Sequence, residues 1–355
     1  MKVFLTGGGS GGHILPNIAL IEGLRAKQRT TPLALGYIGE RGGMEEEMIR
    51  AQQVQFYGIY AGKIRRYFDI QNFFDPFKIL LGFFQSLWIF WRQRPSVLFS
   101  KGGFVSVPVV FAAWCCRIPV IIHESDTTPG LATRITSRLA TRICVAWKKT
   151  LSFFPEGKAI LTGIPIRKAI TQGDMARGVS LCGFTNTNKP TLLVIGGSLG
   201  AGALNDFVQN NLFALTKEMN VIHITGKGKS IVAHSDTIGA YAQFEFLGTE
   251  LFDLYKASSL ILSRAGSTLL WEFVELGIPA VLVPLPGHSS RGDQIDNALE
   301  YHSLYPTLSH VIPQESLTLD SFFYGIDILK KQTTEMKPRD LLNAREVIVE
   351  MLVGD

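Results

Sequence analysis

The feature that most constrains the fold is a loop of six residues, five of them glycine, close to the start of the chain. It covers residues 7–12 and follows the short apolar segment 2–6. Apolar residues recur at helical spacing over residues 14–24, so the order strand, loop, helix is predicted. Glycines let backbone amides approach a ligand closely, and amides at a helix N-terminus favour negative charge. The loop therefore predicts a site for a phosphate-like anion.

A histidine stands in the first turn of this predicted helix. The positive end of the helix dipole keeps an imidazole neutral and able to accept a proton, so His13 is a candidate general base or ligand contact. The alternative is a helix-start histidine that bonds only to the loop.

The same loop also matches a dinucleotide-binding pattern. Gly7, Gly9 and Gly12 satisfy GxGxxG, and Glu40 ends the next strand-like run, where an acid that binds ribose could stand. The loop alone thus fits both a nucleotide-sugar enzyme and an NAD(P)-dependent oxidoreductase.

The rest of the chain predicts two domains of the α/β class. Its 355 residues are 46% hydrophobic and 18% charged, which excludes disorder and suffices for two cores. Short apolar runs alternate with helical stretches, as in a doubly wound parallel sheet. At PTLLVIGGSLGAGALND the pattern of strand, glycine-rich loop and helix starts again. We expect two Rossmann-like domains, joined near residues 163–168 and facing a central cleft, which makes a one-site dehydrogenase less natural.

The start of the chain and its cysteines bear on location. Met1 runs directly into a strand and a glycine-rich turn rather than into a secretory signal, and the four cysteines have no CxxC spacing. These features predict a cytosolic protein with reduced thiols and no zinc site.

The second half contains a further candidate site in SRAGSTLLWEF. Gly266 and Ser267 begin a predicted helix after a strand, so their amides can meet an anion. Glu272, about one and a half turns further on, can accept two sugar hydroxyls, and the amide of Gln294 can do similar work. The alternative is that Glu272 pairs with Arg264 or with a lysine on a solvated face.

Residues 61–101 carry the charge excess of the chain, since their basic side chains exceed the acidic ones by five, the net charge of the whole. The seven basic residues are Lys63, Arg65, Arg66, Lys78, Arg92, Arg94 and Lys101, and the two acidic ones are Asp69 and Asp75. Within this segment, DPFKILLGFFQSLWIFWRQRP predicts a helix with Asp75 as its N-cap and Pro95 as its stop. Its apolar run of about 15 residues is shorter than the roughly 20 needed to span a bilayer.

This helix has two apolar faces. We expect the broader one to dock on the sheet, and it consists of Phe77, Leu80, Leu81, Phe84, Leu87, Trp88 and Trp91. The second, formed by Ile79, Phe83 and Phe90, would then be left over and would contact an anionic membrane surface peripherally. The alternative is a helix buried on two sides within a large domain.

Seven sequence blocks together resemble one enzyme family. In chain order they are GGGSGGH, KGGFVSVP, HESDTTPG, GIPIR, GGSLGA, SRAGSTLLWE and RGDQIDNA. The chain resembles the MurG family, the bacterial glycosyltransferases that add N-acetylglucosamine (GlcNAc) to the lipid-linked muramyl-pentapeptide precursor of peptidoglycan.

The resemblance implies a GT-B fold with two domains. Residues 1–165, with a C-terminal helix at about 340–355, would form the acceptor and membrane-associating domain, and residues 166–339 would bind the donor. The enzyme would move GlcNAc from UDP-GlcNAc to the 4-hydroxyl of undecaprenyl-pyrophosphoryl-MurNAc-pentapeptide with inversion, converting lipid I to lipid II. It would work peripherally at the cytoplasmic side of the cell membrane, without nucleic acid. A sugar-nucleotide epimerase of the same fold and an NAD(P)-dependent oxidoreductase remain alternatives.

The resemblance also implies roles for individual residues. The donor would meet uracil-binding backbone at Gly248 to Leu251, ribose-binding Glu272, sugar-binding Gln294, and diphosphate-binding Ser198, Arg167, Ser267, Thr268 and Leu269. The other domain would contribute Ser10, Gly11, Gly12 and His13 next to the reacting groups. Asp126 would also lie near the donor. The acceptor-side loops would contribute Gly102, Gly103, Phe104, His123 and Glu124. Three positions depart from the pattern of many members, which have tyrosine, asparagine and glutamine where this chain has Phe104, Asp126 and Asp293.

The expected mechanism is a direct displacement at the anomeric carbon. His13 would take the proton of the attacking hydroxyl, with His123 and Glu124 as rival bases, while Arg167 and the helix-start amides receive the charge of the departing UDP. The sequence has no DxD triplet, so we expect no essential metal and no other cofactor.

Overall fold

A computed structural model of the chain describes residues 1–28, 32–62, 71–197, 200–233, 235–287, 292–332 and 343–354, without the side chains at positions 71, 72 and 74. The chain divides into two compact units. The first contains Met1–Arg167 and Leu342–Asp355, and the second contains Lys168–Leu341. This division lies two residues beyond the boundary expected from the sequence, so Arg167 falls in the first unit.

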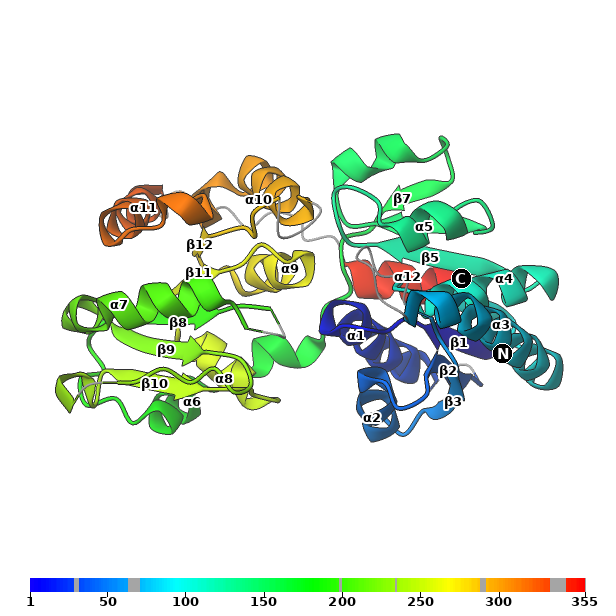
Figure 1. Cartoon of the computed structure of the whole chain (residues 1–355), viewed down its shortest axis with the longest axis horizontal. Helices are drawn as coiled ribbons and strands as arrows, with labels where there is room; N and C mark the ends of the chain where they lie inside the picture. The colour runs from blue at the N-terminus through cyan, green and yellow to red at the C-terminus, as the bar shows by residue number, and fades with distance from the viewer. Residues whose placement is uncertain are drawn as a thin grey trace. The chain divides into compact units, whose positions relative to one another are not determined.

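The first unit is built on a parallel sheet of seven strands in the order β3-β2-β1-β4-β5-β6-β7 (Figure 1). The strands are β1 (Lys2–Thr6), β2 (Ala34–Glu40), β3 (Gln55–Ile59), β4 (Val97–Ser100), β5 (Val120–Glu124), β6 (Arg142–Val145) and β7 (Ala159–Leu161). Thr6, the last residue of β1, pairs with Ile38 of β2 and Ser100 of β4. The strand order reverses between β1 and β4, and ligands of such sheets bind at the carboxyl ends of the strands beside this reversal.

Alternate residues of each strand pack on opposite faces of this sheet. The described helices of the unit are α1 (Gly11–Gln28), α2 (Met44–Ala51), α3 (Gln71–Gln93), α4 (Ser106–Cys115), α5 (Leu131–Thr136) and α12 (Ala344–Val353), with the 3-10 helix η1 (Lys148–Phe153). Val3 and Leu5 of β1 share a core with α1, α2 and α12. Phe4, between them, joins α3 and α4 on the other face.

The C-terminal helix α12 belongs to the first unit, although the second unit precedes it in the chain. Figure 1 shows α12 within the first unit. Its Ile348, Val349 and Leu352 are buried in the same core as α1. At Gly23 of α1 a Cβ would lie 2.9 Å from Cγ2 of Val349, so glycine allows the two helices to approach closely.

The second unit has its own parallel sheet of six strands, in the order β10-β9-β8-β11-β12-β13. The strands are β8 (Thr191–Ile195), β9 (Asn220–Ile224), β10 (Tyr241–Phe244), β11 (Leu260–Ser263), β12 (Ala280–Leu282) and β13 (Ser309–Val311). The order reverses between β8 and β11, as it does at β1 and β4.

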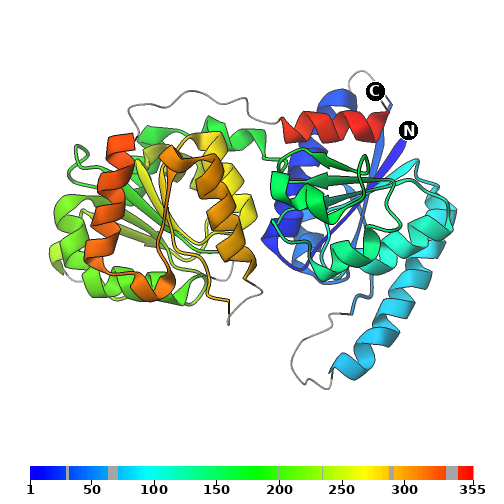
Figure 2. The ribbon, with the colours of Figure 1, turned by 90° about the horizontal axis from the view of Figure 1, so that it is seen from above.

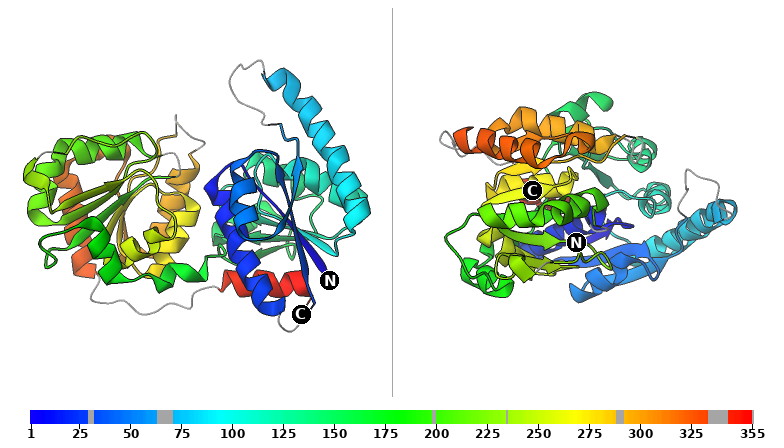
Figure 3. Two further views of the ribbon diagram at one scale, coloured as in Figure 1. Left: turned by 90° about the horizontal axis from the view of Figure 1, so that it is seen from below. Right: turned by 60° about the vertical axis from the view of Figure 1, so that its left-hand side comes forward.

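Helices lie on both faces of this second sheet (Figure 3). They are α6 (Met175–Cys182), α7 (Gly202–Glu218), α8 (Glu250–Ala257), α9 (Ser267–Leu276), α10 (Asp293–Leu304) and α11 (Leu319–Gln332), with the 3-10 helices η2 (Lys168–Gln172), η3 (Ser235–Thr237), η4 (Pro306–Leu308) and η5 (Gln314–Ser316). Each unit is therefore a doubly wound Rossmann-like domain, as predicted.

The aromatic helix α3 begins earlier than expected. It starts at Gln71 and ends at Gln93, so Asp75 lies inside it rather than at its N-cap. Asp75 is buried and forms an ion pair with Lys78 at 3.5 Å. The predicted end before Pro95 is correct. Lys63, Arg65 and Arg66 lie outside the described residues.

The prediction of which face of α3 docks was wrong. Phe90, assigned to the membrane strip, is 1% exposed and packs in the core with Phe4, while Phe83 and Ile79 are half-buried. The exposed side chains belong instead to the stripe expected to dock, and they are Phe77, Leu80, Leu81, Phe84, Trp88 and Trp91. We call these six residues the exposed aromatic face of α3.

Small residues on α3 explain this orientation. At Gly82 a Cβ would overlap the carbonyl oxygen of Tyr60, and the buried Ser86 hydroxyl bonds back to the Gly82 carbonyl at 2.7 Å. The backbone amide of Tyr60 also donates to Oε1 of Gln85 at 2.8 Å. The face that contains Gly82 can approach the segment after β3, whereas the bulkier face cannot. Figure 2 shows α3 running along the first unit beside α4.

No helix in the described part of the chain is long and apolar enough to cross a membrane.

Candidate active site

His13 lies where the glycine-rich loop after β1 meets the loop after β4. It is the third residue of α1, and its backbone amide donates to the Ser10 carbonyl at 3.0 Å. At Gly103 a Cβ would lie 3.2 Å from Cδ2 of His13, and Gly103 has a φ of +83°. Glycine is thus required there for the loop to lie against the imidazole. The structure therefore brings His13 together with Gly102 and Gly103.

A buried carboxylate supports the glycine-rich loop from inside. The amide of Gly9 points to Oε2 of Glu45 at 3.4 Å, and Oε1 of Glu45 accepts from the amide of Glu40 at 2.9 Å. At Gly8 a Cβ would overlap the Glu45 carboxylate. One amide of the predicted anion cradle therefore faces an internal anion, which leaves the helix start at Gly11 and Gly12 as the part that fits a ligand.

Two further buried side chains fix this loop. Asn17 donates from Nδ2 to the carbonyls of Thr6 and His13, each at 3.2 Å. The Tyr37 hydroxyl donates to the Gly7 carbonyl at 2.6 Å, and burial raises the pKa of this phenol far above its ordinary value. Asn17 and Tyr37 act on backbone atoms, so the sequence motif itself gave no sign of them.

Phe104 lies against the same loop. At Gly9, where φ is +82°, a Cβ would be 2.6 Å from Cε1 of Phe104. The next turn is closed by Ser106, whose hydroxyl donates to the Gly103 carbonyl at 2.7 Å. The phenyl ring at this departing position therefore packs on the glycine-rich loop.

Glu124 holds together the loop that follows β5. Its Oε1 accepts from the amides of Ser125 and Asp126 at 2.8 and 3.0 Å, and its Oε2 accepts from the amide of Gly130 at 3.0 Å. This arrangement gives the carboxylate a structural role and makes it a poor rival to His13 as the base.

His123 is buried beneath that loop. Its Nε2 lies 2.8 Å from the Gly163 carbonyl, which can only accept, so Nε2 carries the proton. Burial, together with the ammonium of Lys101, holds the pKa of His123 well below its ordinary value. A buried imidazole that resists protonation in this way also fits a structural role better than that of a general base.

Lys101, between β4 and the two glycines, was not predicted as a site residue. It is 1% exposed, and its ammonium donates to the hydroxyl of Ser125. Burial lowers its pKa to about 8, although the nearby Glu124 and Asp126 act in the opposite direction. The only sign of it in the sequence is a lysine at the end of an apolar strand.

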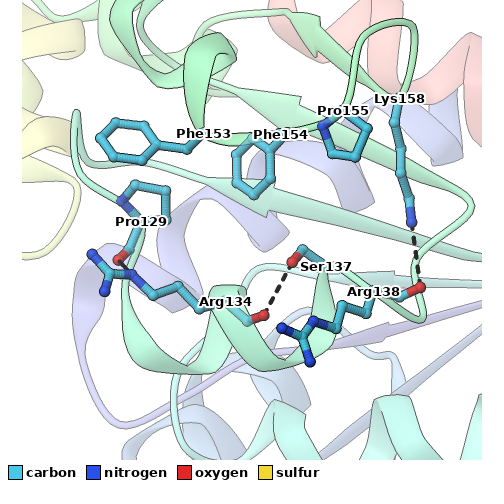
Figure 4. Close-up of a pocket in the computed structure, with 8 residues that line it drawn as sticks. All are labelled: Pro129, Arg134, Ser137, Arg138, Phe153, Phe154, Pro155 and Lys158. Carbon is cyan, nitrogen blue, oxygen red and sulfur yellow. Dashed lines mark hydrogen bonds between the residues drawn. The ribbon is translucent and has the colours of Figure 1, made fainter.

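A basic pocket adjoins the loop after β5. It has a volume of about 350 Å³ and is lined by Pro129, Arg134, Ser137, Arg138, Phe153, Phe154, Pro155 and Lys158 (Figure 4). Nε of Arg134 donates to the Pro129 carbonyl at 3.0 Å, and Nζ of Lys158 donates to the Arg138 carbonyl at 3.3 Å. Three cations beside two phenyl rings make this recess suited to anionic groups.

In the second unit the predicted anion site lies at the start of α9. The helix begins at Ser267 after the N-cap Gly266, and a Cβ at Gly266 would meet no atom within 4 Å. The amides of Ser267, Thr268 and Leu269 form its first turn, at the carboxyl end of β11 beside the strand reversal. This is the geometry in which helix N-termini bind phosphate.

Glu272 is buried on the same helix. It is 3% exposed, and the Tyr255 hydroxyl of α8 donates to its Oε2 at 2.9 Å. Arg264, its suggested partner, donates instead to the carbonyls of Val283 and Pro284 at 3.0 and 3.2 Å and to Gln314 at 2.6 Å. Tyr255 was missed because it occupies an apolar helix face, where tyrosine gives no distinct signal.

The remaining donor-side residues lie on loops and at one helix start. Oε1 of Gln294 accepts from the amide of Leu285 at 3.0 Å, so this side chain holds the segment after β12. The amide of Gly248 is exposed and donates to Oε2 of Glu250 at 3.0 Å, while Leu251 is half-buried in α8. Arg167 is half-exposed before η2, and Ser198 lies outside the described residues.

Within the described ranges, no group of three or more histidine, cysteine or acidic side chains is placed to hold a metal ion.

Two family models match the chain. The N-terminal domain of glycosyltransferase family 28 matches residues 3–145, and its C-terminal domain matches residues 191–349.

Named relatives extend over nearly all of the chain. A protein of Legionella pneumophila strain Paris is 43% identical over 358 residues, covering 99% of this chain and 96% of its own length. A protein of Clostridium botulinum strain Langeland is 45% identical over 300 residues, covering 84% and 83%. Both are named UDP-N-acetylglucosamine--N-acetylmuramyl-(pentapeptide) pyrophosphoryl-undecaprenol N-acetylglucosamine transferase.

Solved structures agree on the fold. MurG of Acinetobacter baumannii superposes with a TM-score of 0.74 at 23% identity, over 100% of this chain and 99% of that one. A UDP-GlcNAc 2-epimerase of Neisseria meningitidis gives 0.66 at 15% identity, over all of both chains. These likenesses and the two parallel sheets are consistent with the GT-B fold. Given the family models and the relatives above 40% identity, the chain belongs to glycosyltransferase family 28 and, within it, to the MurG family.

Proposed function

We propose that this protein transfers GlcNAc from UDP-GlcNAc to the 4-hydroxyl of undecaprenyl-pyrophosphoryl-MurNAc-pentapeptide, with inversion at the anomeric carbon. The observation that carries the proposal is the 43% identity to a transferase of that name over 99% of the chain. The N-terminal ends of α1 and α9 support it, since the backbone amides there suit substrates with diphosphate groups.

The test is direct transfer. The purified protein is incubated with radiolabelled UDP-GlcNAc and the lipid-linked acceptor in detergent, and the lipid is extracted. We expect label in the lipid fraction, dependent on the acceptor, and much less label with UDP-glucose as donor. Absence of labelled lipid would refute the proposal.

His13 is the proposed general base. Its ring lies beside the Gly102–Gly103 turn, and Asn17 ties its helix to the Thr6 carbonyl at the end of β1. It takes the proton from the 4-hydroxyl as that oxygen attacks the anomeric carbon, and UDP leaves from the opposite side. A positioned base of this kind contributes roughly a hundred- to ten-thousand-fold in rate.

The second unit is proposed to bind UDP. The first amides of α9 receive the diphosphate, Glu272 accepts the ribose hydroxyls and Gln294 contacts the sugar. Ser198, and Arg167 from the end of the first unit's main segment, are proposed as further diphosphate ligands. Amides fixed in a helix start are preorganised for the charge that develops on the leaving UDP, an effect worth on the order of 3 kcal/mol per donor.

No metal and no other cofactor is proposed to take part. The basis is the absence of a DxD triplet from the sequence, together with backbone amides that can receive the diphosphate charge. Transfer should continue in EDTA. If UDP bound only in the presence of Mg²⁺, the proposal that no metal takes part would be overturned.

The exposed aromatic face of α3 is proposed to rest on the cytoplasmic side of the cell membrane. Both of its tryptophans, Trp88 and Trp91, are exposed, and the guanidinium of Arg92 lies 5.8 Å from the centre of the Trp88 ring. Amphipathic rings flanked by cations are typical of interfacial helices that bind anionic lipid.

Two alternatives are less well supported: a sugar-nucleotide epimerase, suggested by the fold, and an NAD(P)-dependent oxidoreductase, suggested by the glycine-rich loop. The likeness to the epimerase, at 15% identity, establishes the fold alone. An oxidoreductase would give a thermal shift with NAD(P)H, whereas we expect a shift with UDP and none with NAD(P)H.

A further inference from the structure

Lys101 joins the ends of three adjacent strands. Its backbone amide donates to the Thr6 carbonyl at the end of β1, and its ammonium donates to the hydroxyl of Ser125, just after β5. Lys101 itself follows β4. Its side chain therefore lies under both loops that carry the predicted acceptor-side residues.

Hydrogen bonds fix the backbone around Ser125, the residue whose hydroxyl accepts from this ammonium. The Ser125 carbonyl accepts from Nε1 of the buried Trp147 at 2.7 Å, and the Asp126 carbonyl accepts from the hydroxyl of Thr150 at 3.1 Å. The amide of Asp126 is held by Glu124. The backbone of Ser125 and Asp126 is thus held in one position. Lys101 is buried on the inner side of this loop, and the Asp126 side chain is half-exposed.

Glu124 and Asp126 are the two neighbours of Ser125, whose hydroxyl accepts from the Lys101 ammonium, and their carboxylates differ in what they bind. Glu124 already accepts three backbone amides. Asp126 is partly exposed and follows the carboxyl end of β5, the edge of the sheet at which ligands bind. Although the resemblance placed it near the donor, it belongs to the unit that is expected to bind the acceptor. A carboxylate there would repel a diphosphate-bearing substrate unless a cation balances it.

An ammonium buried to this extent is costly, because removing it from water carries a penalty of several kcal/mol that only good partners offset. An apolar side chain of similar length would fill the same space without that penalty. The retained charge is thus best explained by what it does for the exposed side of the loop.

We propose that Lys101 is a positioning residue for the acceptor: its buried ammonium balances the carboxylate of Asp126, so that Asp126 can accept a sugar hydroxyl while an anionic diphosphate binds on the same loops. This inference rests on the proposed transferase function. It also accounts for an acid at a position where many members of the family have asparagine.

The test compares K101M, D126N and the double variant in the full-length transferase, with initial rates measured against acceptor and donor separately. We expect K101M to raise the acceptor KM about tenfold and to leave the donor KM unchanged, because only acceptor-side charge is unbalanced. In the double variant, D126N should restore most of the acceptor KM. K2M serves as the matched control, since Lys2 lies at the opposite end of β1 and donates to the Gln93 carbonyl at 2.7 Å.

Ionic strength provides a second readout that a purely structural lysine would not affect. The acceptor KM of K101M should fall towards the wild-type value as salt rises, because salt screens the repulsion between Asp126 and the substrate. If K101M does not fold, S125A removes the hydrogen bond to the ammonium while keeping both charges, and it should raise the acceptor KM by a smaller, salt-sensitive factor.

Independent effects of K101M and D126N, or an acceptor KM of K101M that salt does not change, would overturn the inference. Wild-type transfer in the same assay separates this result from a failure of the proposed function, because without wild-type turnover the transferase proposal itself would fall.

Discussion

The Tyr255 hydroxyl donates to Oε2 of Glu272 at 2.9 Å, and both side chains are buried between α8 and α9. Glu272 therefore does not depend on solvent for its orientation. A neighbouring helix fixes the carboxylate that is proposed to bind ribose.

Replacing Tyr255 with phenylalanine should weaken donor binding. The change removes one hydrogen bond to a buried carboxylate, and such bonds are worth enough to raise the KM for UDP-GlcNAc roughly tenfold. The acceptor KM should stay unchanged. The exposed Tyr324 of α11 supplies the control Y324F, which should leave both KM values as they are. Equal donor KM values for Y255F and wild type would show that the hydroxyl does not orient Glu272 for the donor.

Changing His13 to alanine should abolish most turnover and leave UDP binding intact. The imidazole lies in the first unit, whereas the proposed UDP contacts of α9 lie in the second. We expect kcat to fall by roughly a hundred- to ten-thousand-fold. Calorimetric titration with UDP should give an unchanged Kd. Loss of UDP binding in H13A, or retention of full turnover, would contradict the role of general base.

The two faces of α3 should respond differently to substitution. F84S and W88S remove exposed aromatic rings, so binding to anionic vesicles should decrease while the melting temperature stays the same. F90S removes a ring packed in the core and should lower the free energy of unfolding by about 3 kcal/mol or more. Co-sedimentation and thermal denaturation measure these effects. Vesicle binding that survives loss of both Phe84 and Trp88 would argue against the proposed membrane face.

The buried Lys101 should make stability depend on pH in the alkaline range. Its pKa falls from an ordinary 10.5 to about 8 in the folded protein, so between these values the unfolded chain binds a proton that the native protein has released. The stability of wild type relative to K101M should therefore rise as the pH increases from about 8 to 10.5, by at most about 3 kcal/mol. Below pH 8 the difference should be constant. Urea unfolding at several pH values measures the free energy of unfolding of each protein. Plots of this free energy against pH that run parallel for wild type and K101M would contradict the low pKa.

Much of the fold could be predicted because the signals were local. The strand at residues 2–6, the loop after it and the position of His13 in the first turn of α1 follow from hydrophobic periodicity and glycine content. The placement of Gly102 and Gly103 beside His13 follows from the rule that parallel strands end at one edge of the sheet.

The errors arose where several packings satisfy the same pattern. Helix α3 is apolar on two faces, so hydrophobicity alone does not determine which face is buried. The deciding residues were Gly82 and Ser86, whose small size allows a close approach that larger side chains prevent. Tyr255 and Glu45 were also missed, because each acts through a contact between segments that are distant in sequence.

The return of α12 to the first unit makes the second unit an insertion within the first. A chain shortened to end after α11 would therefore lose part of the core of the first unit. It would uncover the apolar side chains of α1 and the first sheet against which Ile348, Val349 and Leu352 pack, and so destabilise the unit that begins at the N-terminus although the chain is shortened at its C-terminus.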